Sequence, residues 1–185
     1  MEKIGRIRRS TVAVALVAVG AVAVAGSAAA TTAAVNDTIR AGATKKTTVV
    51  RFDGPPQTTV SSTFQDIPGT QATITFTKPS ILLVTLTAES SCFNIAPPAG
   101  SATTCFVRIV ADGVGELGPG FNGNFAFDSS DQGSESQSSF EGHAMQRSSN
   151  VLPPGTYTVR PQYAVNGAAA FQVDDIHVTV EAVQA

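Results

Sequence analysis

Apolar and polar residues alternate along most of the chain after residue 46, which is the pattern of half-buried β-strands. The alternation is clearest at 72–77, where Ala72, Ile74 and Phe76 would face inward, and at 81–89. No window after residue 30 has the periodicity of a helix. The segments in which strands are expected are 47–52, 58–64, 72–77, 81–89, 106–110, 140–147, 156–165 and 171–183. With frequent turn residues between them, they predict an all-β fold: an antiparallel β-sandwich, jelly-roll-like, with eight to ten strands.

Two positions interrupt this pattern and predict irregular strands. Apolar residues change parity within 171–183 at Asp174 and Asp175, which indicates a β-bulge because one extra residue reverses the side-chain faces. Pro161 lies in the middle of 156–165 and has no N–H to donate. We therefore expect an edge strand or a bulge there.

The two cysteines follow the strong apolar segment 81–89 and are separated by the loop-forming residues 94–101. In an exported protein, a pair of cysteines predicts one disulfide, Cys92–Cys105. Closing a loop of this length would stabilise the fold by roughly 3 kcal/mol. The prediction is a pair of antiparallel strands whose joining loop is tied at its base. The alternative is two free, buried thiols.

The N-terminus predicts export. Residues 1–9 are basic, 12–25 form an apolar run, and small residues follow at 26–30. This is the pattern of a secretory signal peptide cleaved after Ala30, or alternatively after Ala34. The apolar run is shorter than the roughly 18 residues that a membrane-spanning helix needs. The expected domains are a signal peptide at 1–30, a flexible leader at 31–46 and a β-sandwich at 47–185, secreted by the Sec or the twin-arginine route.

Charge limits the expected partners. Cleavage at residue 30 would remove four basic residues and one acid, which changes the formal net charge from −2 to −5. An acidic domain is poorly suited to phosphate backbones, so we expect no nucleic-acid partner. With no further apolar span, no membrane insertion is expected after cleavage of the signal peptide. The sequence indicates no cofactor.

The longest polar tract, from Gly118 to Ser139, is expected to be a loop and is the candidate binding site. Its carboxylates Asp128, Asp131 and Glu135 could hold Ca²⁺ weakly, although their spacing is not that of an EF-hand. A solubilising loop without metal is the favoured interpretation. The phenylalanines could form a contact surface or fold back over the sheet edge. The candidate binding residues are Phe121, Asn122, Asn124, Phe125, Phe127, Asp128, Asp131 and Glu135.

The sequence contains two histidines, His143 and His177, and no nucleophile-elbow motif. Asp175 and His177 are spaced to share one strand face, where a hydrogen bond or a metal contact is possible. An Asp-x-His pair of this kind more often belongs to a solvated surface. A Ser-His-Asp triad is recognised by geometry, so the sequence leaves it open. We expect no catalytic residues and no enzymatic activity.

The segments Leu152–Val159 and Val173–Val178 resemble the closing strands of secreted jelly rolls of the C1q/TNF-like and carbohydrate-binding-module kinds. The resemblance covers about 35 residues and implies a fold more than an activity. C1q/TNF-like domains often trimerise, so an oligomer is possible. Sugar-binding modules usually stack sugars on exposed Trp or Tyr, whereas this chain has no Trp, and Tyr157 and Tyr163 are expected on the buried face. The predicted function is a secreted, non-catalytic protein that binds an unknown protein or glycan surface. The alternative is a carbohydrate-binding module for cell-wall or environmental glycans.

Overall fold

A computed structural model describes residues 44–94, 103–119, 125–130, 139–167 and 169–185 of the 185-residue chain. The expected signal peptide and residues 31–43 of the expected leader lie outside the described residues. The remaining three leader residues, 44–46, belong to the first strand.

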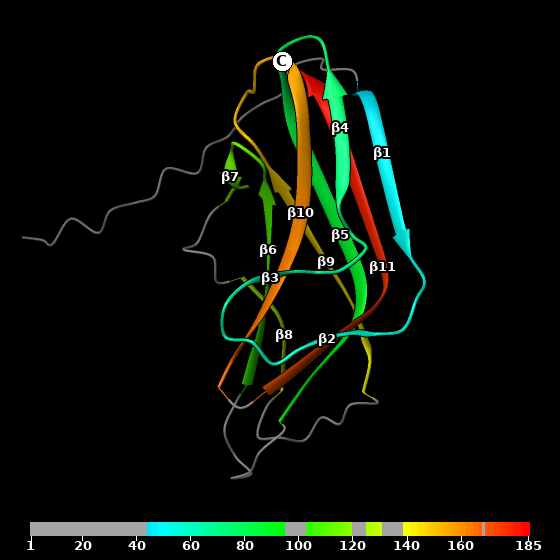
Figure 1. The fold of residues 1–185 in the computed structure, drawn as a ribbon, viewed down its shortest axis with the longest axis vertical. Helices are drawn as coiled ribbons and strands as arrows, with labels where there is room; N and C mark the ends of the chain where they lie inside the picture. The colour runs from blue at the N-terminus through cyan, green and yellow to red at the C-terminus, as the bar shows by residue number, and fades with distance from the viewer. Residues whose placement is uncertain (1–43, 95–102, 120–124, 131–138, 168) are drawn as a thin grey trace, which may run out of the picture. The chain divides into compact units, whose positions relative to one another are not determined.

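The described residues form eleven strands, and every pairing between them is antiparallel (Figure 1). In chain order, the strands are β1 (Thr44–Phe52), β2 (Gln57–Thr59), β3 (Gln65–Asp66), β4 (Ala72–Phe76), β5 (Ser80–Asn94), β6 (Thr103–Ala111), β7 (Gly115–Glu116), β8 (Phe125–Ser130), β9 (Glu141–Ser148), β10 (Gly155–Asn166) and β11 (Ala169–Gln184).

The strands form two sheets with the connectivity of a jelly roll. One sheet has the order β1-β11-β5-β9, with β2 also paired to β11. The other has the order β3-β10-β6-β7, with β4 paired to β10 and β8 paired to β6. Four antiparallel pairs are nested along the chain, from β1 with β11 on the outside through β4 with β10 and β5 with β9 to β6 with β8. This order confirms the predicted all-β, jelly-roll-like sandwich.

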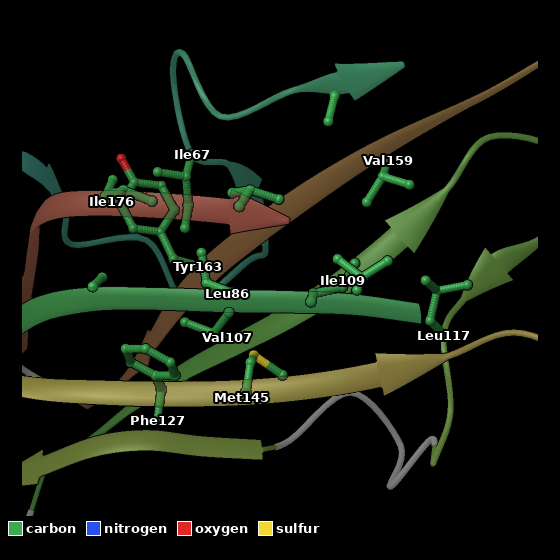
Figure 2. Packing of buried hydrophobic residues seen from close by; sticks show 14 of the residues in the cluster. Ile67, Leu86, Val107, Ile109, Leu117, Phe127, Met145, Val159, Tyr163 and Ile176 are labelled. Atoms are coloured by element: carbon green, nitrogen blue, oxygen red, sulfur yellow. The ribbon is translucent and has the colours of Figure 1, made fainter. Parts of the chain in front are cut away.

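The inward faces of both sheets share one apolar core. The predicted alternation is confirmed in β4, where Ala72, Ile74 and Phe76 are buried while the residues between them are exposed. Figure 2 shows side chains from both sheets meeting in this core, among them Leu86 of β5 and Val107 of β6. Burial of the apolar positions therefore accounts for the pairing of the two sheets.

The predicted disulfide is confirmed, but the prediction that the strands on either side of it pair with each other is wrong. Cys92 and Cys105 are bonded, with their Cα atoms 5.9 Å apart. However, β5 and β6 belong to different sheets and do not pair. The bond therefore links the two sheets across the core, and both sulfurs are fully buried. Most of the intervening loop, residues 95–102, lies outside the described residues.

The predicted bulge is confirmed in β11. The register against β5 shifts between Asp174 and His177, and Asp175 adopts a positive φ of 45°. The side chain of Asp174 accepts a hydrogen bond from the N–H of Asp175, at 2.9 Å. This local bond supports a left-handed conformation that few residues other than Gly, Asn and Asp adopt readily.

The expectation of an edge strand or bulge at Pro161 is wrong, although its physical premise holds. Strand β10 is an interior strand, with β6 on one side and β3 and β4 on the other. β4 pairs only as far as Val159 and β3 begins at Gln162, so Pro161 lies opposite the gap. The carbonyl of Pro161 accepts from the N–H of Ile67 on this same side, at 2.9 Å. The missing donor therefore faces the place where the neighbouring ladder is interrupted.

The strand expected at 58–64 is much shorter than predicted, because β2 ends at Thr59. The hydroxyl of Thr59 accepts from the N–H of Ser61, and the hydroxyl of Ser61 accepts from the N–H of Thr63. These local bonds satisfy backbone donors that a strand would direct to a neighbour.

Candidate functional site

The tract expected to be one loop, Gly118 to Ser139, contains a strand. Residues 125–130 form β8, which pairs with β6. Phe127 is only 4% exposed and packs against the rings of Phe171 and His143. The prediction of a continuous loop is therefore wrong for β8, and Phe127 belongs to the core. The candidate residues Phe121, Asn122, Asn124, Asp131 and Glu135 lie outside the described residues.

The edge formed by β8 and β9, which we call the β8–β9 edge, combines polar and aromatic side chains. Each of these strands pairs with only one other strand of its sheet in the described residues. The inward positions of β9 are Glu141, His143, Met145 and Arg147, as the residues opposite them on β5 show. Charged residues that point inward are one way in which natural edge strands avoid pairing with other chains.

Asp128 connects the two sheets through a buried polar contact. Its side chain is 5% exposed, and its Oδ2 accepts from the hydroxyl of Ser90 at 2.6 Å. Its Oδ1 lies 3.9 Å from Nε2 of His143, and a carboxylate oxygen of Glu141 lies equally far from that nitrogen. The hydroxyl of Ser130, two residues further along β8, is also buried and has no hydrogen-bond partner in the described part of the chain. Asp128 thus faces the interior, which was not expected of a residue in a binding loop.

The Ser90, Asp128 and His143 side chains do not form the arrangement of a serine hydrolase. In that arrangement the imidazole accepts the serine proton, and the carboxylate orients the imidazole. Here the serine donates its only proton to the carboxylate, and Nε2 of His143 has no hydrogen-bond partner among the described residues. This geometry favours a role in holding the two sheets together over nucleophilic catalysis.

Phe125 and Arg147 form the aromatic part of the β8–β9 edge. The guanidinium carbon of Arg147 lies 4.4 Å from the centre of the Phe125 ring, which is a cation–π geometry. Arg147 is buried and donates to the carbonyl of Gln146 at 2.9 Å. Burial lowers the pKa of Arg147, an effect that the negative charge of Glu116 opposes. The guanidinium thus fixes one face of the Phe125 ring and leaves the residue 37% exposed.

The second histidine lies apart from this edge. His177 occupies β11, opposite Arg51 on one side and Thr87 on the other. Its Nε2 is buried without a hydrogen-bond partner, and no bond joins it to Asp175 within the described part of the chain. The possible Asp-x-His contact is therefore not formed.

No group of three or more His, Cys, Asp or Glu side chains in the described segments could hold a metal ion. Of the weak Ca²⁺ candidates, Asp128 is bonded to Ser90, and Asp131 and Glu135 are not described.

A second feature, which sequence reasoning missed, is a cavity of about 340 Å³ where β1 and β5 begin and β4 and β11 end. Its lining is basic and polar around one aromatic ring, and consists of Lys46, Thr75, Phe76, Thr77, Lys78, Ser80 and Gln184. The two lysines are 32 residues apart in the sequence, so only the pairing of β1 and β4 with their neighbours could have brought them together. The sequence signal was limited to one lysine, Lys46, just before the strand expected at 47–52 and another, Lys78, shortly before the strand expected at 81–89.

The outward face of β10 carries a network of charged and amide side chains. The guanidinium of Arg160 donates to Asp66 at 3.0 Å and to Asp112 at 2.6 Å. The amide of Gln162 donates to Asp66 at 2.6 Å. The Gln162 bond lowers the pKa of Asp66, burial opposes this, and Arg160 lowers it further. The side-chain oxygen of Gln162 also accepts from Arg108 at 2.7 Å. Because these groups bond to one another, we interpret the network as a structural element of the sheet.

No protein-family model and no curated protein sequence matches this chain. Among the described residues, none forms a helix long and apolar enough to cross a membrane.

Proposed function

We propose that the protein is a secreted, non-catalytic binding protein that contacts a partner protein through the β8–β9 edge. The observation that supports this best is Phe125, which is exposed yet held in place by Arg147. Protein interfaces are enriched in aromatic residues and arginine, and their central contacts are made by such ordered side chains.

The distribution of exposed apolar residues favours this edge. The large apolar side chains exposed on the described surface are Val49, Val60, Phe125 and Val151. Phe125 is the only aromatic residue among them. The segments that adjoin β8, residues 120–124 and 131–138, are rich in Asn, Ser, Gly and acidic residues, which supply adaptable hydrogen bonds at binding surfaces.

Secretion is supported by the N-terminal sequence and by the buried disulfide, since disulfides persist mainly in oxidising compartments. The non-catalytic interpretation is supported by the Ser90–Asp128 bond, which occupies the serine proton.

The proposal is tested by using the purified protein and two variants to capture binding proteins from the culture medium and cell surface of the producing cell. Phe125→Ser removes the aromatic contact, and Val151→Ser removes an exposed apolar side chain elsewhere. The proposal is supported if the wild type and the Val151→Ser variant retain a protein that the Phe125→Ser variant does not retain. Cross-linking must then show that this protein contacts β8. Equal retention by both variants contradicts it. Native mass of the secreted protein would show whether the partner is a second copy.

The alternative function is a carbohydrate-binding module. Neither tyrosine offers a free ring for sugar stacking, because Tyr163 is buried and Tyr157 stacks on Phe76 with ring centres 5.0 Å apart. The polar cavity is the observation that favours this alternative. A glycan array, probed with and without Ca²⁺, tests it, and the absence of any retained glycan would count against it.

A further inference from the structure

We propose that the cavity lined by Lys46 and Lys78 binds an acidic sugar, free or as a unit of an acidic polysaccharide, with its carboxylate between the two ammonium groups. This site is separate from the β8–β9 edge, and the two proposals are tested with different variants.

The charge of the cavity is the first observation. Both of its charged side chains are lysines, and neither forms an ion pair with a described residue. The chain as a whole has a formal net charge of −2. Two unpaired ammonium groups beside one hollow are therefore a local exception, and they favour an anionic ligand.

The placement of Lys46 follows from the strand register. Lys46 lies opposite Ala182, which is buried, so its side chain leaves β1 on the inward side. The register shifts between Thr44 and Lys46, as at a β-bulge. A bulge redirects the neighbouring side chain, which here lines the cavity instead of covering the sheet.

Lys78 is placed by a turn with several hydrogen bonds. The hydroxyl of Ser80 donates to the carbonyl of Lys78 at 2.9 Å. Ser80 also exchanges two backbone hydrogen bonds with Leu152, at 3.0 and 2.8 Å. The carbonyl of Pro79 accepts from the N–H of Ala185 at 3.1 Å. The turn is thus bonded to two other segments, which reduces the cost of ordering it around a ligand.

The remaining lining suits a sugar better than a bare inorganic anion. Thr77 and Gln184 supply hydroxyl and amide groups that can pair with sugar hydroxyls, whereas the hydroxyl of Thr75 already shares a hydrogen bond with that of Thr156, at 2.9 Å. Phe76 also lines the cavity, but it is only 6% exposed and its ring is stacked on Tyr157, so we expect the sugar to be held by polar contacts and not by ring stacking. The volume lies at the lower end of the range for small-molecule pockets.

A purely structural role for the two lysines is the competing interpretation. Their aliphatic stems could cover Phe76 while the ammonium groups remain in water. In that case their replacement would change stability slightly and would change no ligand affinity.

The test measures binding of trigalacturonate to the purified protein by calorimetry, with Lys46→Gln, Lys78→Gln and the double variant. Arg51→Gln is the matched control, because Arg51 is exposed on the opposite face of β1 and its replacement removes the same charge. We expect each lysine variant to weaken binding roughly fivefold and the control to leave it unchanged. Unaltered thermal unfolding would show that the variants are folded.

Two further ligands separate the possible outcomes. An uncharged galactose trimer should not bind, and sodium sulfate should bind much more weakly than trigalacturonate. Sulfate binding of equal strength would overturn the assignment to a sugar, and the absence of trigalacturonate binding would overturn the site. An equal loss of affinity in the lysine variants and in Arg51→Gln would show that only the overall charge matters, and this result would also overturn the site. The Phe125→Ser variant should bind trigalacturonate normally.

Discussion

The contact between Ser90 and Asp128 gives the sharpest test of the β8–β9 edge. The bond joins β5 of one sheet to β8 of the other, and both side chains are buried. Its length of 2.6 Å is in the range of a hydroxyl bonded to a carboxylate. Such bonds contribute about 1.5–3 kcal/mol to stability, and loss of one partner also leaves the other unsatisfied.

We therefore expect Asp128→Ala to lower the free energy of unfolding by about 2–3 kcal/mol. For a domain of this size the melting temperature should fall by about 4–12 °C. Asp128→Asn keeps an acceptor for the Ser90 hydroxyl, so it should cost about 1 kcal/mol. Asp53→Ala, at an exposed carboxylate, should cost less than about 0.5 kcal/mol.

Urea unfolding of the single variants and of the Ser90→Ala, Asp128→Ala double variant measures the coupling directly. Residues in one hydrogen bond should show an interaction energy of about 1–2 kcal/mol. A coupling near zero, or an Asp128→Ala variant as stable as Asp53→Ala, would refute the structural role of Asp128. It would then restore this carboxylate as a candidate for ligand contact.

Three other outcomes follow from the fold. Reduction of the disulfide should lower the free energy of unfolding by about 3 kcal/mol, measured by urea unfolding with and without reductant. Gly69→Ala should destabilise by about 1–2 kcal/mol, because Gly69 has a φ of 76° and a Cβ there would lie 2.5 Å from the Phe52 ring; a neutral result would contradict this backbone geometry. The hydrogen bond from Gln162 lowers the pKa of Asp66 below its ordinary value of 3.8 in the folded protein. The ionised carboxylate therefore stabilises the fold above pH 3.8, and this stabilisation is lost as the pH falls through the pKa of Asp66 in the folded protein. Wild type should thus lose stability relative to Asp66→Asn on acidification below about pH 4, and parallel acid-unfolding curves would contradict this.

The sequence predicted those parts of the fold in which each residue's polarity matches its burial. Ala72, Ile74 and Phe76 alternate with exposed threonines, so β4 was evident. The parity change at Asp174 predicted the bulge, because a sheet with a buried face cannot shift by one residue without one.

The errors occur where polarity and burial disagree. Strand β8 was predicted to be loop because Asp128 and Ser130, although polar, are buried. The side chains beside the Asp128 carboxylate, Ser90 and His143, lie on other strands and leave no local signal. The prediction that β5 and β6 pair as a hairpin was wrong for a different reason. Period-two patterning specifies which face of a strand is buried but not which sheet the strand joins.

The pairing of β1 with β11 has a consequence for how this chain can be made. Thr44 lies opposite Val183, so β1 has no partner among the described strands until β11 has been synthesised. Completion of this sheet must therefore wait for the synthesis of β11, which makes its closure a late step of folding. A chain that stops before Ala169 would lack β11, an interior strand of its sheet, and should give a product that proteases remove.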